Sequence, residues 1–133
     1  MRFTRLFTWT TAVLFSCGVA DACERISNWQ DLLATVNRAM NQKVGQLTLC
    51  PFAVDKPAAS RLVLNRPLRL TCQKSGAGDR CLIDGRGNHF RIQGPNAQII
   101  LEGFTFQSAT ECAVRVAPTA TKPQLIQGCE FLG

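Results

Sequence analysis

The sequence predicts an all-β solenoid of about four coils with a short helix at its N-terminal end. Two series of short apolar motifs alternate between residues 45 and 131. In the first series an apolar–polar–apolar triplet returns after 21, 22 and 24 residues: Leu47–Leu49, Leu68–Leu70, Phe90–Ile92 and Val114–Val116. The second falls between the triplets: Leu64–Asn65, Ile83–Gly85, Leu101–Gly103 and Ile126–Gly128. A period near 20–25 residues is typical of solenoids, in which each unit buries its apolar face only against its neighbours.

Residues 1–22 are predicted to be a secretory signal peptide. Two arginines precede an apolar run, and Ala20 and Ala22 supply small residues at the −3 and −1 positions of a cleavage site. The run is too short and wrongly flanked for a spanning helix. Acylation of Cys23 is an alternative, weakened by Asp21 and by the absence of a leucine before the small residues.

Residues 23–44 are predicted to form a capping helix. Ser27 and Gln30 have the spacing of a capping box. An apolar stripe with helical spacing follows, over a helix from about Asn28 to about Asn41: Trp29, Leu32, Leu33, Val36 and Met40. The stripe could instead bind a partner or a membrane surface. We favour a cap, because the end of a solenoid exposes unpaired strand edges that need covering.

Residues 45–133 are predicted to form the solenoid, with two strands in each unit. Each triplet has the period-2 alternation of a strand with one face inward, and Gly, Pro and Asn separate the strands. The Leu-x-x-Leu-x-Leu-x-x-Asn pattern of leucine-rich repeats does not occur. Because four coils are few and residues 129–133 read as a strand without a cap, we expect either further coils or pairing with another chain, and we favour further coils.

Six cysteines remain once Cys17 leaves with the signal peptide. An even number in an exported chain predicts three disulfides, with 15 possible connectivities. We expect pairing between neighbours in the sequence: Cys23–Cys50, Cys72–Cys81 and Cys112–Cys129. A metal site is not expected, since no Cys-x-x-Cys occurs and the chain has a single histidine.

The motifs resemble right-handed parallel β-helix proteins of the pectin-lyase-like class. The resemblance covers roughly residues 45–131 and is carried by Ile83-Asp84-Gly85-Arg86-Gly87, Phe90-Arg91-Ile92 and Leu101-Glu102-Gly103-Phe104-Thr105-Phe106. It implies a triangular coil with inward stacks of aliphatic and aromatic side chains. The N-terminal part is similar to secreted β-helix proteins of unassigned function in microbial eukaryotes.

The resemblance also raises the possibility of an enzyme that cleaves an acidic polysaccharide. Lyases of this class hold calcium with clustered carboxylates, and its hydrolases use three carboxylates. Only eight carboxylates follow residue 22, and none forms an Asp-Asp or Asn-x-Asp motif. Asp84 and Glu102 occupy equivalent motif positions and are expected to stack on neighbouring coils, where two carboxylates could bind calcium or exchange protons. We favour two solvated carboxylates, and expect no catalytic residue and no cofactor.

His89 and the glycines beside it are expected to be part of the scaffold. Without a second histidine or a clear acidic partner, His89 is interpreted as a turn-edge residue with no catalytic task. Gly85 and Gly87 are expected at a sharp corner, where a positive φ is needed.

Three arginines form the candidate binding site. Arg69, Arg91 and Arg115 each occupy the centre of a triplet and are expected to form one outward column. Stacked like charges are unfavourable unless an anion lies across them, and Arg binds carboxylate or sulfate through two contacts. The alternative is a solubilising face with the guanidinium groups spread into water.

The overall expectation is a secreted, non-catalytic extracellular or cell-surface module that binds an acidic polysaccharide. Removing residues 1–22 leaves 13 basic and eight acidic side chains, without the basic block of a nucleic-acid-binding arm. Nucleic acid is therefore not an expected partner, and no later stretch predicts a membrane span. A partial or degenerate polysaccharide lyase or glycoside hydrolase, with calcium only in the lyase case, is one alternative. A structural matrix component is another.

Overall fold

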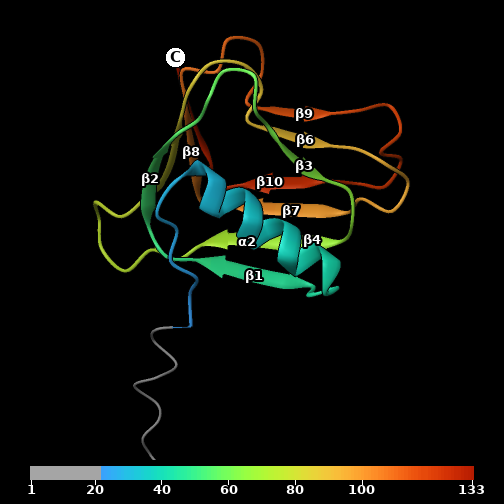
Figure 1. The fold of residues 1–133 in the computed structure, drawn as a ribbon, viewed down its shortest axis with the longest axis horizontal. Helices are drawn as coiled ribbons and strands as arrows, with labels where there is room; N and C mark the ends of the chain where they lie inside the picture. The colour runs from blue at the N-terminus through green and yellow to red at the C-terminus, as the bar shows by residue number, and fades with distance from the viewer. Residues whose placement is uncertain (1–21) are drawn as a thin grey trace, which may run out of the picture.

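The computed structural model describes residues 22–133 and confirms an all-parallel β-solenoid (Figure 1). The expected signal peptide, apart from Ala22, lies outside these residues. The elements, in chain order, are α2 (Trp29–Asn41), β1 (Gln46–Leu49), β2 (Phe52–Asp55), β3 (Leu62–Leu64), β4 (Leu68–Cys72), β5 (Cys81–Asp84), β6 (Phe90–Ile92), β7 (Ile99–Glu102), β8 (Phe104–Gln107), β9 (Val114–Val116), β10 (Leu125–Gln127) and β11 (Glu130–Leu132).

The strands form three parallel sheets, which are the three walls of a triangular coil (Figure 1). Sheet A has the order β1-β4-β7-β10, sheet B the order β2-β5-β8-β11, and sheet C the order β3-β6-β9. A coil therefore contains three strands, not the two expected from the sequence, and the described chain makes about three turns rather than four. Along sheet A, residues in register are 23, 31 and 25 positions apart: Gln46, Arg69, Ile100 and Leu125.

Helix α2 covers the end of the solenoid next to β1, as expected (Figure 1). Its stripe is buried and joins the core of the coils. The N-cap is Asn28 rather than Ser27: the Asn28 side chain accepts from the Asp31 amide, and the Asp31 carboxylate accepts from the Ser27 amide. Asn28 and Asp31 thus take the parts that the sequence predicted for Ser27 and Gln30, and they satisfy the free amides of Asp31 and Ser27. The Trp29 indole donates to the Ser60 hydroxyl at 2.7 Å, which ties the helix to the first coil.

Inward side chains of all three sheets form one continuous core. Alternation along β2 to β7 places most of their Leu, Ile and Val side chains inside, as in the buried–exposed–buried pattern of β4. Phe90 of β6 and two phenylalanines of β8 make its aromatic part, with Phe90 edge-on to Phe104 and Phe106 at ring distances of 5.9 and 5.2 Å. Burial of this stack removes large apolar area from water and is a main source of stability.

The corner between sheets B and C requires glycine at position 85. Gly85 has φ +154°, and a Cβ built on it would lie 2.4 Å from the Lys56 carbonyl oxygen of the preceding coil. Lys56 is itself buried, and its ammonium donates to the carbonyls of Pro57 and Ser60. The corner is therefore a close contact of two backbones, beside a buried cation that is held by carbonyls of its own loop.

Two of the three expected disulfides are present, Cys23–Cys50 and Cys72–Cys81. The expected Cys112–Cys129 bridge is not formed, and both residues have free thiols. Cys112 lies in the corner between sheets B and C, whereas Cys129 lies in the corner between sheets A and B. A strand of sheet B runs from one corner to the other, so its length separates the two cysteines. Cys112 and Cys129 follow one another among the cysteines of the sequence, but they are not neighbours in space.

Candidate functional site

Arg91 and Arg115 lie side by side on neighbouring strands of sheet C, each at the middle of its strand. Arg91 is the middle residue of β6 and is in register with Arg115 of β9, while Val63 of β3 occupies the same position on the first coil. Phe90 and Ile92, which flank Arg91, are buried, so Arg91 is on the outward face, and Arg115 is on the same face because it is in register with Arg91. The Arg91 Nε donates to the Gln93 side chain at 2.7 Å. These two arginines are part of the column of three that the sequence predicts.

Arg69 does not belong to this column. It lies on β4 in sheet A, in register with Gln46 and Ile100. The expectation failed because consecutive triplets do not all lie on the same wall: a coil has three strands, and the triplets pass from sheet A to sheet C between Leu70 and Phe90. Arg69 is also neutralised, since its guanidinium makes a two-point contact with Glu102, from Nε to Oε1 at 2.7 Å and from the second nitrogen to Oε2 at 2.9 Å.

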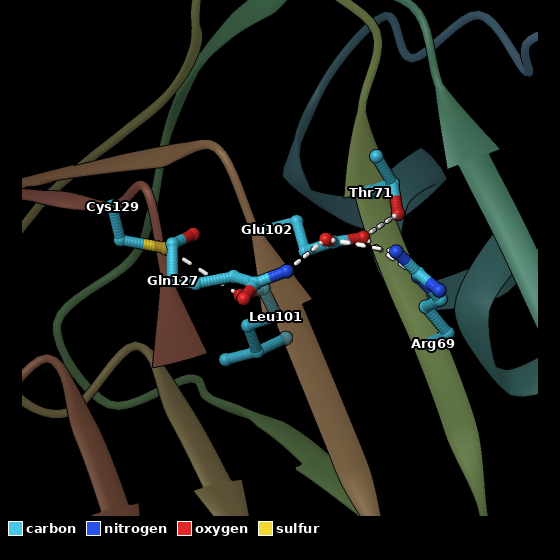
Figure 2. Close-up of polar contacts among 6 residues, drawn as sticks. All are labelled: Arg69, Thr71, Leu101, Glu102, Gln127 and Cys129. Atoms are coloured by element: carbon cyan, nitrogen blue, oxygen red, sulfur yellow. Dashed lines mark hydrogen bonds and ion pairs between the residues drawn. The ribbon is translucent and has the colours of Figure 1, made fainter. Parts of the chain in front are cut away.

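Glu102 is the centre of a polar network that crosses three coils (Figure 2). Besides Arg69, the Thr71 hydroxyl donates to Glu102 Oε1 at 2.9 Å, and the Gln127 amide donates to Oε2. The hydrogen bonds from Arg69, and then that from Thr71, lower the pKa of Glu102 to about 2, while partial burial opposes them. The carboxylate acts as a structural clamp between β4, β7 and β10, and it has little capacity left for a ligand.

Replacing Glu102 with Gln is expected to lower stability at neutral pH but not in strong acid. The pKa of Glu102 is lower in the folded chain than its ordinary value of 4.5, so its contribution is present above pH 4.5 and is lost as the pH falls towards 2. The loss should be modest, because the Arg69 side chain is 47% exposed. Urea midpoints of the native protein and Glu102→Gln should differ at pH 7 and converge near pH 2. Glu111→Gln is the control, and equal midpoints of Glu102→Gln and the control at pH 7 would contradict the clamp.

The three sheets differ in charge. The strands of sheet C contain Arg91 and Arg115 and no carboxylate, whereas those of sheet B contain three acids, Asp55, Asp84 and Glu130, and no basic residue. Sheet A carries the paired Arg69 and Glu102. Asp84 is in register with Asp55 and Gln107, so the expected stacking of Asp84 on Glu102 is wrong. The two acids lie on different walls because a coil has three strands, which also separates Arg69 from Arg91.

His89 lies in the bend directly before β6, at the edge of a turn as expected, but its side chain is part of the core. Its ring is fully buried and packs against Phe106 at 5.7 Å between ring centroids. Burial lowers its pKa, and the nearby Lys56 charge acts in the same direction. Lys56, whose pKa burial also lowers, was not found from the sequence, because an isolated lysine after a strand has no pattern that marks it as buried.

Among residues 22–133, no group of three or more His, Cys, Asp or Glu side chains could hold a metal ion. In the same residues, no helix is both long enough and apolar enough to cross a membrane. No protein-family model, no curated protein and no solved structure matches the chain. The arginine pair on sheet C is therefore the candidate site on its geometry alone.

Proposed function

We propose that the protein is a secreted, non-catalytic extracellular module that binds an anionic polysaccharide along sheet C. The observation that carries the proposal is the registered pair Arg91 and Arg115, on a sheet whose strands contain no carboxylate. Neither arginine is in an ion pair within residues 22–133. Two disulfides support an oxidising destination, and the signal-like residues 1–22 support export.

The spacing of the arginines suits a polymer that runs along the solenoid axis. Neighbouring strands lie about 4.8 Å apart, so two like charges in register repel each other unless an anion lies between them. A guanidinium binds carboxylate or sulfate through two parallel hydrogen bonds. Gln93 holds the Nε edge of Arg91, which leaves its terminal nitrogens for a ligand. Successive anionic groups of one chain would then bind Arg91 and Arg115 in turn.

The double variant Arg91→Gln, Arg115→Gln is expected to weaken binding to polygalacturonate or dextran sulfate about tenfold or more at low salt. Each lost charge-assisted contact removes roughly 1.5–3 kcal/mol before screening. Isothermal titration at several salt concentrations would measure the change. The double variant Arg25→Gln, Lys43→Gln, which removes the same charge near α2, is the matched control. Equal weakening of both variants would show non-specific attraction and contradict the site.

A partial polysaccharide lyase of the pectin-lyase-like class is the second candidate. Asp55 and Asp84 are neighbours in register on sheet B, and such a pair could bind calcium or exchange a proton with a substrate. A third carboxylate is not grouped with them in the described chain. Calcium-dependent release of unsaturated sugars from polygalacturonate, abolished in Asp84→Asn, would favour this candidate over the binding module.

A further inference from the structure

His89 occupies a site that suits only its neutral form. One ring nitrogen, Nε2, lies 2.6 Å from the Gly85 carbonyl oxygen. A carbonyl only accepts, so Nε2 carries the proton and Nδ1 is the bare nitrogen of the neutral ring. Nδ1 is buried and has no hydrogen-bond partner in the described structure. A second proton on this ring would therefore create a buried N–H donor without an acceptor, which is costly.

The surroundings of the ring oppose a positive charge. Phe106 packs against it, and the side chain of His89 is fully buried. Two charged groups act on it: the buried Lys56 ammonium disfavours protonation, and the Asp84 carboxylate favours it. Burial and Lys56 together outweigh the Gly85 hydrogen bond and Asp84, so the pKa of His89 is lower than its ordinary value of 6.5.

The backbone of His89 joins three successive coils at the start of sheet C. Its N–H donates to the Ala113 carbonyl at 2.9 Å, and its carbonyl accepts from the Leu62 N–H at 2.9 Å. The next residue, Phe90, also donates to Ala113, at 2.8 Å. Arg91 follows directly, so a movement of His89 would disturb the register of β3, β6 and β9 on which the Arg91–Arg115 pair depends.

We propose that His89 is a pH-sensitive latch of the corner between sheets B and C. In acid, protonation expels the ring from its pocket, loosens β6 and disorders the arginine pair. The effect on stability is independent of any ligand. The effect on binding rests on the proposed function: the protein would release a bound anionic polysaccharide in acid.

The stability arm uses residues 23–133, in which His89 is the sole histidine. Histidine is the side chain whose ordinary pKa lies between pH 5 and 8, so its contribution can be isolated there. Because the unfolded chain takes up the proton more readily, the unfolding equilibrium constant should rise from pH 7.5 to 5.5, by at most about tenfold for a single proton. In His89→Gln, whose amide can still donate to Gly85, the rise should be absent. The same rise in both proteins would overturn the latch.

A second measurement keeps the test decisive if His89→Gln fails to fold. Nuclear magnetic resonance of the native protein should show a ring that titrates at lower pH than the ordinary 6.5, and amides of His89 and Phe90 that lose exchange protection as the ring takes up its proton. A ring that titrates near 6.5, with both amides still protected, would overturn the proposal. This measurement is made on the native protein and does not require a variant.

The binding arm uses dextran sulfate, because its sulfate groups remain charged across this range. The ratio of Kd at pH 5.5 to Kd at pH 7.5 should be larger for the native protein than for His89→Gln. Absence of binding at pH 7.5 would contradict the proposed function and leave the stability arm to decide on the latch. Binding with the same ratio in both proteins would support the function and overturn the control of binding by His89.

Discussion

Gly85→Ala is expected to destabilise the protein by about 3–5 kcal/mol, a large part of the total stability of a domain of this size. The residue has φ +154°, a conformation that costs about 1–3 kcal/mol for any side chain. The new methyl group would also lie 2.4 Å from the Lys56 carbonyl oxygen, where backbone and not a flexible side chain must move. Separation of the coils there would weaken the Lys56 amide to Asp84 carbonyl bond, now 2.7 Å long.

Urea unfolding followed by fluorescence would measure this loss. In residues 23–133 the sole tryptophan is Trp29, which is buried where α2 meets the first coil. Gly45→Ala is the matched control, because nothing lies within 4 Å of a Cβ at that position. The free energy of unfolding of the control should stay within a few tenths of a kcal/mol of the native value. A Gly85→Ala protein as stable as the control would mean that the two backbones at the corner are not in close contact.

The sequence was sufficient for the fold class because the alternation of the strands and the stripe of α2 are local patterns. It did not show which wall each strand joins. Coils along sheet A differ in length, with 23 residues from Gln46 to Arg69 and 31 from Arg69 to Ile100. A loop of variable length changes the spacing of the motifs without changing the triangular cross-section. The spacing of the motifs therefore predicted one column for strands that belong to different sheets.

The candidate site was predicted in part for the same reason. Arg91 and Arg115 are consecutive members of sheet C, so the motif period and the true coil agree there. Arg69 lies on another wall, and its pairing with Glu102 depends on the register of β4 and β7. The burial of Lys56 and His89 depends on contacts between coils at one corner. No pattern within a single strand carries that information, and it emerges only when successive coils are stacked.

Phe106→Ala is expected to cost about 3–5 kcal/mol, as for other large aromatic residues in a core. Phe106 is 1% exposed and lies 5.2 Å from Phe90 and 5.4 Å from Phe131 between ring centroids. Phe131→Ala is the matched control: it removes a ring of the same stack that is 57% exposed, and should cost far less. Similar losses in urea unfolding would show that the stack is not centred on Phe106.

The same variant separates packing from protonation at the corner. Removing the Phe106 ring opens space beside His89, the ring 5.7 Å away, and water entering that space could accept a hydrogen bond from a protonated Nδ1. Phe106→Ala should therefore lower stability at every pH and yet weaken the pH dependence between 7.5 and 5.5. Phe131→Ala, whose ring lies outside the His89 pocket, should keep the native pH dependence. A Phe106→Ala protein with the full native dependence would mean that the charge on His89 is opposed by Lys56 rather than by the missing acceptor.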